Sequence, residues 1–356
     1  MAVITKKSKP QMSFPSFFIY KKIFSFVLSV AACLNFTSCE AKQEVKKANS
    51  VFALNTVFEQ KIYGEENGLF SQNASMLHQN ELIFSHTLAE AELYKLNESG
   101  QGTLSEKLLS LVKVSNDVYK KSNGAFDIAL GNLCDLWDFD EGVKPLSEEI
   151  SFALNNSGSD KLELNENEIK LNGVKLNLGG IAKGAAVGEM LEAYKQNRVN
   201  GGIISCSSAI GVIGSKNGDL FKIGVRDPDD VNGQIGVLEI TDCLISTSGD
   251  YERSFIIEGE KYHHILDAKT GYPVKTNIRS VTVVADITNQ SDLFTVGAYT
   301  DALSTALFSM GVNEESLALL ESYSMQAIFV TDNEIYITNG LKSKFTSSSH
   351  RELKAV

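Results

Sequence analysis

Hydrophobic and polar positions follow two different periods along the chain, and the period changes most clearly between residues 174 and 195. Residues 174–178 alternate apolar and polar side chains, as a strand does, and Gly179-Gly180 then interrupts the pattern. From Ile181 to Lys195 the apolar residues recur at the spacing of one helix face. We therefore expect a strand, a two-glycine turn and a helix in this stretch.

The same two periods predict mixed helices and strands in the rest of the chain. The expected strands cover residues 51–63, 221–228 and 279–285, with a strand pair in 201–214 and hairpins in 161–173 and 327–338. The expected helices cover most of 75–96, then 103–122, 300–310 and 317–323. Residues 124–139 follow neither period, and we expect a glycine-bracketed loop there.

The first 38 residues have the pattern of a signal peptide. They carry five Lys and no acidic residue, and Ile23–Phe36 is a 14-residue apolar run, too short to span a bilayer. The run ends in Phe36-Thr37-Ser38-Cys39, which resembles a bacterial lipobox. We expect a lipoprotein signal peptide over 1–38, lipidation of Cys39, a tether over 39–50, the folded domain over 51–345 and a C-terminal tail over 346–356. The alternative is a plain secretory signal followed by an incidental cysteine.

Charge and cysteine content narrow the class of protein. Without residues 1–38 the chain has 28 basic and 44 acidic side chains, a net charge of −16. This acidity argues against nucleic acid as a partner and against adhesion to an anionic membrane surface. We expect an exported protein that faces the periplasm or the outer surface and meets the membrane through its lipid alone. Cys134, Cys206 and Cys243 have neither disulfide-framework nor zinc spacing, so we expect buried thiols.

Three groups of polar residues could carry chemistry. Gly179-Gly180 before a helix start favours phosphate, and Lys183 adds a charge to the same anion, although a plain packing turn has the same sequence. Asp301 and Thr305 lie one helical turn apart and offer two oxygen ligands suited to Mg²⁺, although Asp is also a common helix cap. His263-His264 could supply a base, or could be a cross-strand surface pair.

Five motifs, taken together, resemble the signature blocks of the FAD:protein FMN transferase (ApbE) family over about residues 51–345. The motifs are GAFD (124–127), LGGIAKG (178–184), SGDYER (248–253), HHILDAKTGYPV (263–274) and DALSTAL (301–307). The resemblance implies Mg²⁺-dependent cleavage of FAD, transfer of FMN to a Thr or Ser hydroxyl of an exported acceptor protein, and release of AMP. It also implies a two-lobed, T-fold-like α+β fold of antiparallel sheets and helices, with FAD between the lobes.

The resemblance assigns roles to individual residues. Those assigned to FAD are Ala125, Phe126, Asp127, Asn177, Lys183, Ser248, Asp250 and Ile265. Those assigned to Mg²⁺ are Asp301, Thr305 and the backbone oxygen of Gly180. His264, together with Asp301, is assigned to catalysis, and takes the acceptor proton or positions the attack.

Three departures from the family pattern bear on FAD affinity and substrate choice. Asn177 stands where the family often has Asp, and Thr87 replaces a tyrosine that stacks on the flavin. Ser207-Ser208-Ala209 replaces Gly-Gly-Asp or Gly-Gly-Asn. Two other functions use the same residues: an Mg²⁺-dependent FAD pyrophosphatase with water as the acceptor, and a non-catalytic flavin-binding lipoprotein.

Overall fold

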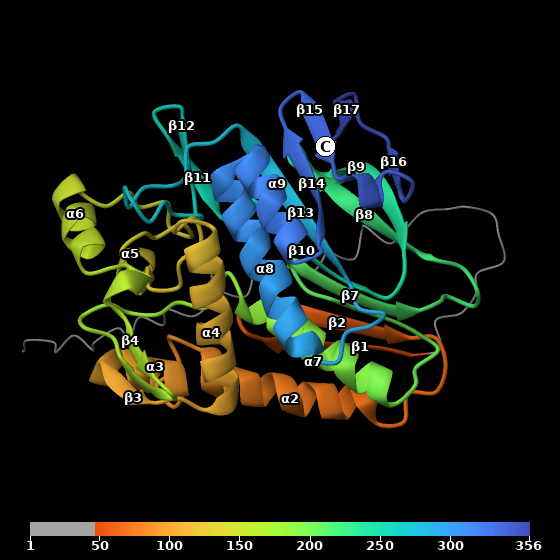
Figure 1. Cartoon of the computed structure of the whole chain (residues 1–356), viewed down its shortest axis with the longest axis horizontal. Coiled ribbons are helices and arrows are strands. Elements are labelled where there is room, and N and C mark those ends of the chain that lie inside the picture. Colours follow the sequence, from red (N-terminus) through yellow and green to blue (C-terminus); the bar gives the residue numbers. More distant parts are fainter. Residues whose placement is uncertain (1–46) are drawn as a thin grey trace, which may run out of the picture. The chain divides into compact units, whose positions relative to one another are not determined.

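A nine-stranded sheet runs through the part of the chain that the computed structural model describes, residues 47–356 (Figure 1). Neighbouring strands pair antiparallel except β15 and β17, which pair parallel. The strand order is β1 (Lys47–Ala53), β2 (Thr56–Ile62), β6 (Gly201–Ser205), β7 (Ala209–Gly214), β10 (Cys243–Gly249), β13 (Ile278–Asp286), β14 (Gln326–Thr331), β15 (Glu334–Ile337) and β17 (Glu352–Ala355).

Three smaller sheets complete the strands. They are β16 (Phe345–Ser347), β9 (Asp230–Ile240) and β8 (Phe221–Asp227); β11 (Ser254–Ile257) and β12 (Glu260–His263); and β3 (Gln101–Thr103), β5 (Glu168–Lys170) and β4 (Glu163–Asn165). The β16-β9-β8 sheet packs against one face of the large sheet, where Leu238 shares a core with Ile245 and Val330. Burial of these aliphatic side chains between two sheets stabilises that half of the fold.

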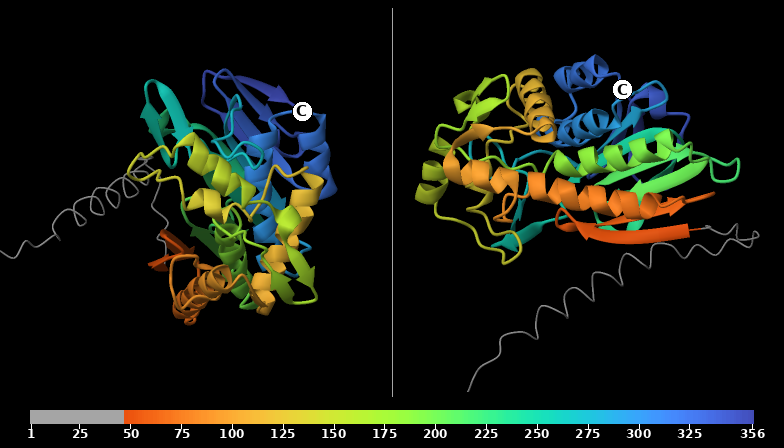
Figure 2. Two further views of the ribbon diagram at one scale, coloured as in Figure 1. Left: turned by 90° about the vertical axis from the view of Figure 1, so that its left-hand side faces the viewer. Right: turned by 90° about the horizontal axis from the view of Figure 1, so that it is seen from below.

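Of the helices in the described residues, α2, α7, α8 and α9 lie on the opposite face of the large sheet. The helices are α2 (Leu69–Phe84), α3 (Glu92–Ser99), α4 (Glu106–Lys121), α5 (Gly131–Cys134), α6 (Ser147–Asn155), α7 (Ala182–Gln196), α8 (Leu293–Met310) and α9 (Glu314–Ser322), with short 3₁₀ turns at Ser159–Lys161 and Asn339–Leu341. α8 lies across β10 and β13 with α4 beside it (Figure 1). The view from below in Figure 2 shows α2, in orange, alongside α7, in light green.

The crossing of α7 and α8 depends on glycines: Gly188 lies against the Leu293 carbonyl, and Gly184 and Gly297 face each other. A Cβ on Gly184 would lie 2.3 Å from the carbonyl oxygen of Gly297, and a Cβ on Gly297 would lie 2.1 Å from that of Gly184. Because any side chain would collide with backbone there, the two helices can approach this closely only at glycine. The contact places the second turn of α8 against the first turn of α7.

An aromatic cluster supports the loop that follows β12. The Trp137 ring stacks on Phe139, with centroids 5.6 Å apart, and its Nε1 donates a hydrogen bond to the carbonyl of Gly271 at 3.0 Å. A Cβ on Gly271 would also lie 2.8 Å from Ile150 of α6. The segment from Trp137 to α6 therefore holds the 263–274 loop in place.

The α+β class is confirmed, and most predicted elements are present. The helix after the glycine turn is α7, the 201–214 pair is β6 and β7, and the hairpins in 161–173 and 327–338 are β4–β5 and β14–β15. One prediction was wrong. Residues 174–178 form no strand, because their backbone groups do not pair with a neighbouring strand. The N–H and the carbonyl of Leu176 both hydrogen-bond the Asn97 side chain instead. Most of residues 75–96 is helical as expected, divided between α2 and α3 by residues 85–91.

Both ends of the predicted domain are longer than expected. The 51–63 strand is a β1–β2 hairpin that turns at Leu54-Asn55, both with positive φ, and β1 already begins at Lys47 inside the expected tether. The expected tail, 346–356, contributes to β16 and contains β17. The signal peptide over 1–38 and Cys39 lie outside the described residues. Within residues 47–356 no helix has the length and apolar character needed to cross a bilayer.

Candidate active site

The turn at Gly179-Gly180 lies against α8, and this contact gathers the predicted metal ligands. A Cβ on Gly180 would lie 3.4 Å from Thr305 Oγ1 and 3.1 Å from the Phe126 ring. Thr305 follows Asp301 by one turn of α8, so their side chains share one side of the helix. Gly184 donates its backbone N–H to Asp301 Oδ2 at 2.9 Å. The structure thus brings Gly180, Asp301 and Thr305 into one small region.

Asp301 has an environment that suits a cation. Its side chain is 3% exposed, and within residues 47–356 its second carboxylate oxygen accepts no hydrogen bond. Burial raises the pKa of the Asp301 carboxyl, while the Lys183 charge and the Gly184 N–H act in the opposite direction. A buried carboxylate with so little compensation is stabilised by a bound cation.

The donor set is composed of oxygen. A carboxylate, a hydroxyl and a backbone carbonyl are ligands that Mg²⁺ accepts, with water or phosphate completing the coordination. In the described part of the chain, no group of three or more His, Cys, Asp and Glu side chains is placed to hold a metal. The residues present therefore fit a hard divalent ion such as magnesium that shares its coordination with a phosphate ligand.

Ser248, at the end of β10, orients the Thr305 hydroxyl. Its Oγ lies 3.1 Å from Thr305 Oγ1 and 2.8 Å from Ser304 Oγ, and Ser304 in turn bonds the carbonyl of Asp301 at 2.8 Å. These three hydroxyls form one connected group between the sheet and α8. Ser248, predicted to shape the FAD pocket, therefore touches a predicted metal ligand.

Lys183 is the central positive charge of this region. Its Nζ donates to the carbonyl of Gly179 at 2.5 Å, so the ammonium lies over the glycine turn. After burial, the Lys183 charge has the largest effect on the pKa of four other side chains: Asp301, Glu252, Cys206 and His264. An anion that enters among them would meet a lysine at the start of α7, where the helix dipole is also favourable.

The two adjacent histidines have different environments. His263 uses both ring nitrogens: Nε2 lies 3.0 Å from the Val274 carbonyl, and Nδ1 accepts the Ile265 N–H at 3.3 Å. His264 Nδ1 is buried and finds no hydrogen-bond partner among the described residues. Burial, followed by the Lys183 charge, lowers the pKa of His264 to about 3, so its ring is neutral at pH 7. Of the pair, His264 is the one with a nitrogen free to accept a proton.

The side chains of Asp127 and Asn177 accept hydrogen bonds from the loops beside the glycine turn. Asp127 Oδ1 accepts the Ala129 N–H at 2.7 Å and the Ser159 hydroxyl at 2.5 Å, and Oδ2 accepts the Ser159 N–H at 2.9 Å. Asn177 Oδ1 accepts the Gly179 N–H at 2.8 Å. Both side chains are thus engaged in fixing local backbone, and their predicted contact with FAD stays a prediction.

The remaining predicted FAD residues occupy three different environments. Phe126 is 3% exposed and lies beside Gly180, and its neighbour Ala125 is partly exposed. Ile265 is 5% exposed and belongs to the main core. Asp250 is 8% exposed, and its Oδ2 accepts hydrogen bonds from Arg279 Nε at 2.9 Å and pairs with Lys261 Nζ at 3.0 Å.

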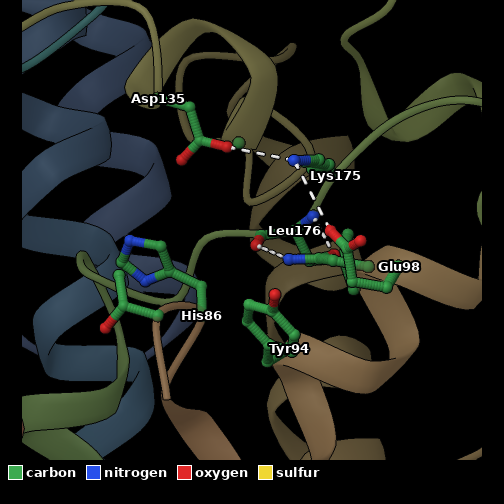
Figure 3. Close-up of a pocket in the computed structure, with 9 residues that line it drawn as sticks. His86, Tyr94, Glu98, Asp135, Lys175 and Leu176 are labelled. Carbon is green, nitrogen blue, oxygen red and sulfur yellow. Dashed lines mark hydrogen bonds and ion pairs between the residues drawn. The ribbon is translucent and has the colours of Figure 1, made fainter. Parts of the chain in front are cut away.

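A cavity of about 360 Å³ opens near the other end of the 174–180 segment (Figure 3). In Figure 3 the side chains of His86 and Tyr94 lie below Lys175, which pairs with Asp135 at 3.4 Å and with Glu98 at 4.0 Å. Its lining is His86, Thr87, Tyr94, Asn97, Glu98, Gly131, Asp135, Lys175 and Leu176. Leu176 is four residues before Gly180, so at most about 14 Å of extended chain separates the cavity from the glycine turn.

The structure adds two residues that the sequence did not single out. The Glu252 side chain is 22% exposed and lies 3.8 Å from Arg226, and burial raises the pKa of its carboxyl. Cys206, just before the β6–β7 turn, has its thiol pKa raised to about 11 by burial, so it remains protonated at pH 7. Glu252 lies inside the SGDYER motif, which was a usable signal, but nothing in the pattern around Cys206 pointed to this region.

Comparisons with known proteins find relatives that cover most of this chain. FAD:protein FMN transferase from Treponema pallidum is 26% identical over 324 residues, which cover 82% of this chain and 87% of that protein. The protein of the same name from Klebsiella pneumoniae is 27% identical over 297 residues, covering 80% and 90%. The crystal structure of the ApbE protein from Thermotoga maritima superposes with a TM-score of 0.74 at 28% identity, over 84% of this chain and 98% of that one.

Two further comparisons concern the fold and the family. The apo form of Pseudomonas stutzeri flavinyl transferase ApbE, at 24% identity and a TM-score of 0.71, shares the fold over 85% of this chain and 98% of its own. The sequence profile of the ApbE family matches residues 54–329. This match includes every predicted catalytic and metal-binding residue and spans most of the chain, which therefore belongs to the ApbE family.

Proposed function

We propose that this chain is an FAD:protein FMN transferase, which moves FMN from FAD to a Thr or Ser hydroxyl of an acceptor protein and releases AMP. One observation carries the proposal: Gly180 lies against Thr305 of α8, one turn from the buried Asp301, and the Lys183 ammonium lies over the same glycine turn. After burial, the charge of Lys183 has the largest effect in lowering the pKa of His264, whose Nδ1 has no partner among the described residues. Pyrophosphate cleavage needs neutralisation of phosphate charge and a base for the attacking hydroxyl, and these residues supply both.

The 174–180 segment would lie along the FAD molecule. FAD carries a ring system at each end of a diphosphate, and the cavity at His86 and Tyr94 has the volume and the aromatic wall for one of these rings. The diphosphate would then lie at Gly180, where the absence of a Cβ leaves room beside Thr305 and Phe126.

Magnesium belongs to the same proposal. Asp301, Thr305 and the carbonyl of Gly180 would hold it, and the bound ion would neutralise negative charge on the diphosphate. Support comes from the burial of Asp301 and from the oxygen-only donor set.

The residues of the chain perform the remaining work. Lys183 and the first turn of α7 bind the diphosphate, and Ser248 keeps the Thr305 hydroxyl in place. The acceptor oxygen forms a bond to the phosphorus of the FMN half, and the bond from that phosphorus to the bridging oxygen breaks. The bond electrons leave with AMP, and His264 takes the hydroxyl proton. Bound diphosphate offsets the Lys183 charge that depresses the pKa of His264, which makes the ring a better base during the reaction.

The test is incubation of the purified full chain with FAD and Mg²⁺, with and without exported proteins of the source cell. AMP is measured by chromatography and covalent flavin by in-gel fluorescence. We expect AMP and a fluorescent acceptor band together, and loss of both in Asp301→Asn and His264→Ala. Free FMN and AMP without any labelled protein would instead indicate water as the acceptor, and tight FAD binding without AMP would indicate a non-catalytic flavoprotein.

Export and lipid anchoring are also part of the proposal, supported by the basic, apolar and lipobox-like sequence of residues 1–39. The acceptor would then be another exported protein. Expression of the full chain with radiolabelled fatty acid should label the wild type and leave Cys39→Ala unlabelled and no longer bound to membranes. Equal membrane association of both proteins would contradict a lipid at Cys39.

A further inference from the structure

A series of charged hydrogen bonds connects the C-terminal segment to the end of β10. It begins at Arg351, whose side chain has no exposed surface. The Arg351 guanidinium donates to Asp227 Oδ1 at 3.1 Å, to Asp229 Oδ2, and through Nε to the Thr331 carbonyl at 2.9 Å. The segment expected to be a tail therefore buries an arginine in the fold.

Arg279, at the start of β13, continues the series. Its Nη1 donates to Asp229 Oδ1 at 2.9 Å and to Asp332 at 2.7 Å, and its Nε donates to Asp250 Oδ2 at 2.9 Å. Burial alone would lower the pKa of Arg279, but the bonds to Asp332 and Asp250 raise it above its usual value. The Arg279 side chain is 21% exposed and that of Asp250 11%, so the bond between these two is shielded from much of the solvent.

Asp250 joins the series to the candidate active site. It follows Ser248-Gly249, and Ser248 bonds Thr305 directly. Its Oδ2 also pairs with Lys261 Nζ at 3.0 Å, on the strand that leads into His263-His264. Its Oδ1 is buried without a partner among the described residues, so the carboxylate depends on Arg279 and Lys261 for compensation.

We propose that Arg279 is a positioning residue for FMN transfer, which acts through Asp250 and is itself held by Arg351 through Asp229. This proposal rests on the proposed function. Arg279 fixes Asp250, Asp250 fixes the end of β10 and the β12 strand, and these two segments present Ser248 and His264.

The chemistry of the guanidinium supports a geometric role. One planar group donates to three carboxylates from three different turns, which a lysine ammonium at the same position could not reach together. A partly buried ion pair of this kind adds little net stability, because desolvation offsets most of the attraction. Its effect should therefore be larger on the geometry of the site than on folding.

The experiment compares Arg279→Lys, Asp250→Asn, their double variant and Arg351→Lys with the wild type. The matched control is Arg198→Lys, because Arg198 is exposed and forms no ion pair within residues 47–356. Initial rates of AMP release are measured against FAD concentration, with Mg²⁺ and a fixed amount of the unmodified acceptor protein that the fluorescent band identifies. Tm is measured for each protein. Rates are expressed per folded molecule.

We expect Arg279→Lys and Asp250→Asn each to lower kcat about 10- to 100-fold, as loss of an orienting partner does at other sites. The KM for FAD should change less than about 3-fold in each variant. The double variant should be no slower than the slower of the two single variants. Arg351→Lys should lower kcat less than Arg279→Lys does. A large rise in KM in Asp250→Asn alone would overturn the proposal, because Asp250 would then contact FAD. Lower Tm with unchanged kcat would also overturn it. If the wild type releases no AMP, the proposed function fails instead.

Discussion

Asp301→Asn should stabilise the metal-free protein while it removes activity. Asp301 is 3% exposed and receives one hydrogen bond, from the Gly184 N–H. Burial raises the pKa of its carboxyl, so the folded protein binds more protons than the unfolded chain at pH values just above 3.8. Stability therefore falls as pH rises through the raised pKa, and the loss is present at pH 7. Asparagine keeps the shape of the side chain and carries no charge.

The expected size follows from these contacts. An incompletely compensated buried polar group costs about 1–3 kcal/mol, and loss of the charge weakens the Gly184 hydrogen bond by about 1 kcal/mol. The free energy of unfolding of Asp301→Asn should thus exceed that of the wild type by up to about 2 kcal/mol, or up to about 4–8 °C in Tm. Mg²⁺ at 100 times its Kd should stabilise the wild type by about 2.7 kcal/mol and reverse the order.

The assay is thermal and urea unfolding of both proteins, in chelator and across a Mg²⁺ titration, together with AMP release from FAD. The asparagine side chain occupies the same space as the aspartate, so a change in packing cannot explain a difference in the Mg²⁺ response. Equal stabilisation of both proteins by Mg²⁺ would refute the role of Asp301 as a metal ligand. A variant less stable than the wild type in chelator would refute the reasoning on burial.

Three further predictions test other parts of the structure. Burial lowers the pKa of His264 from 6.5 to about 3, so below pH 6.5 the unfolded chain binds a proton at this residue that the folded protein does not, and the free energy of unfolding falls. His264→Gln lacks this titration. Between pH 7 and pH 5 its free energy of unfolding, measured in urea, should therefore fall by about 1–2 kcal/mol less than that of the wild type. Gly297→Ala would place a Cβ 2.1 Å from the Gly184 carbonyl, so calorimetry should show a loss of about 1–3 kcal/mol or more and the rate of AMP release should fall. Trp137→Phe leaves the Gly271 carbonyl without its 3.0 Å hydrogen bond and should cost about 1–3 kcal/mol in urea unfolding, with little change in FAD binding.

The parts of the site that the sequence predicted are those set by local rules. The glycine turn and the α7 helix follow from a change of period, and Asp301 and Thr305 share a helix side because of 3.6-residue spacing. That these two elements touch at Gly180 was implied by the family resemblance and by no pattern within either element. Contacts between distant segments depend on the whole fold, which single-sequence periodicity does not encode.

The wrong predictions have the same physical origin. Residues 174–178 alternate like a strand, yet Asn97, far away in sequence, takes both backbone groups of Leu176, and Asn177 N–H bonds the carbonyl of Ile128. The segment 346–356 resembles a tail because it is polar. It is part of the fold because Arg351 pairs with the carboxylates of Asp227 and Asp229, which are distant in sequence. Local composition cannot reveal partners as distant in sequence as Asn97 is from Leu176, 79 residues, or Asp227 from Arg351, 124 residues.

Two separate contacts fix the position of Thr305, and this explains how so few charged residues can define the site. From one side, the α7–α8 glycine contact sets the distance between the glycine turn and α8. From the other, Ser248 on β10 bonds the Thr305 hydroxyl, and the ion pairs of Asp250 hold the end of that strand. A helix can slide or rotate against one contact, but two contacts on different elements leave it little freedom. The predicted ligand at Thr305 therefore depends on both, and a change at either contact should alter the metal site before it unfolds the protein.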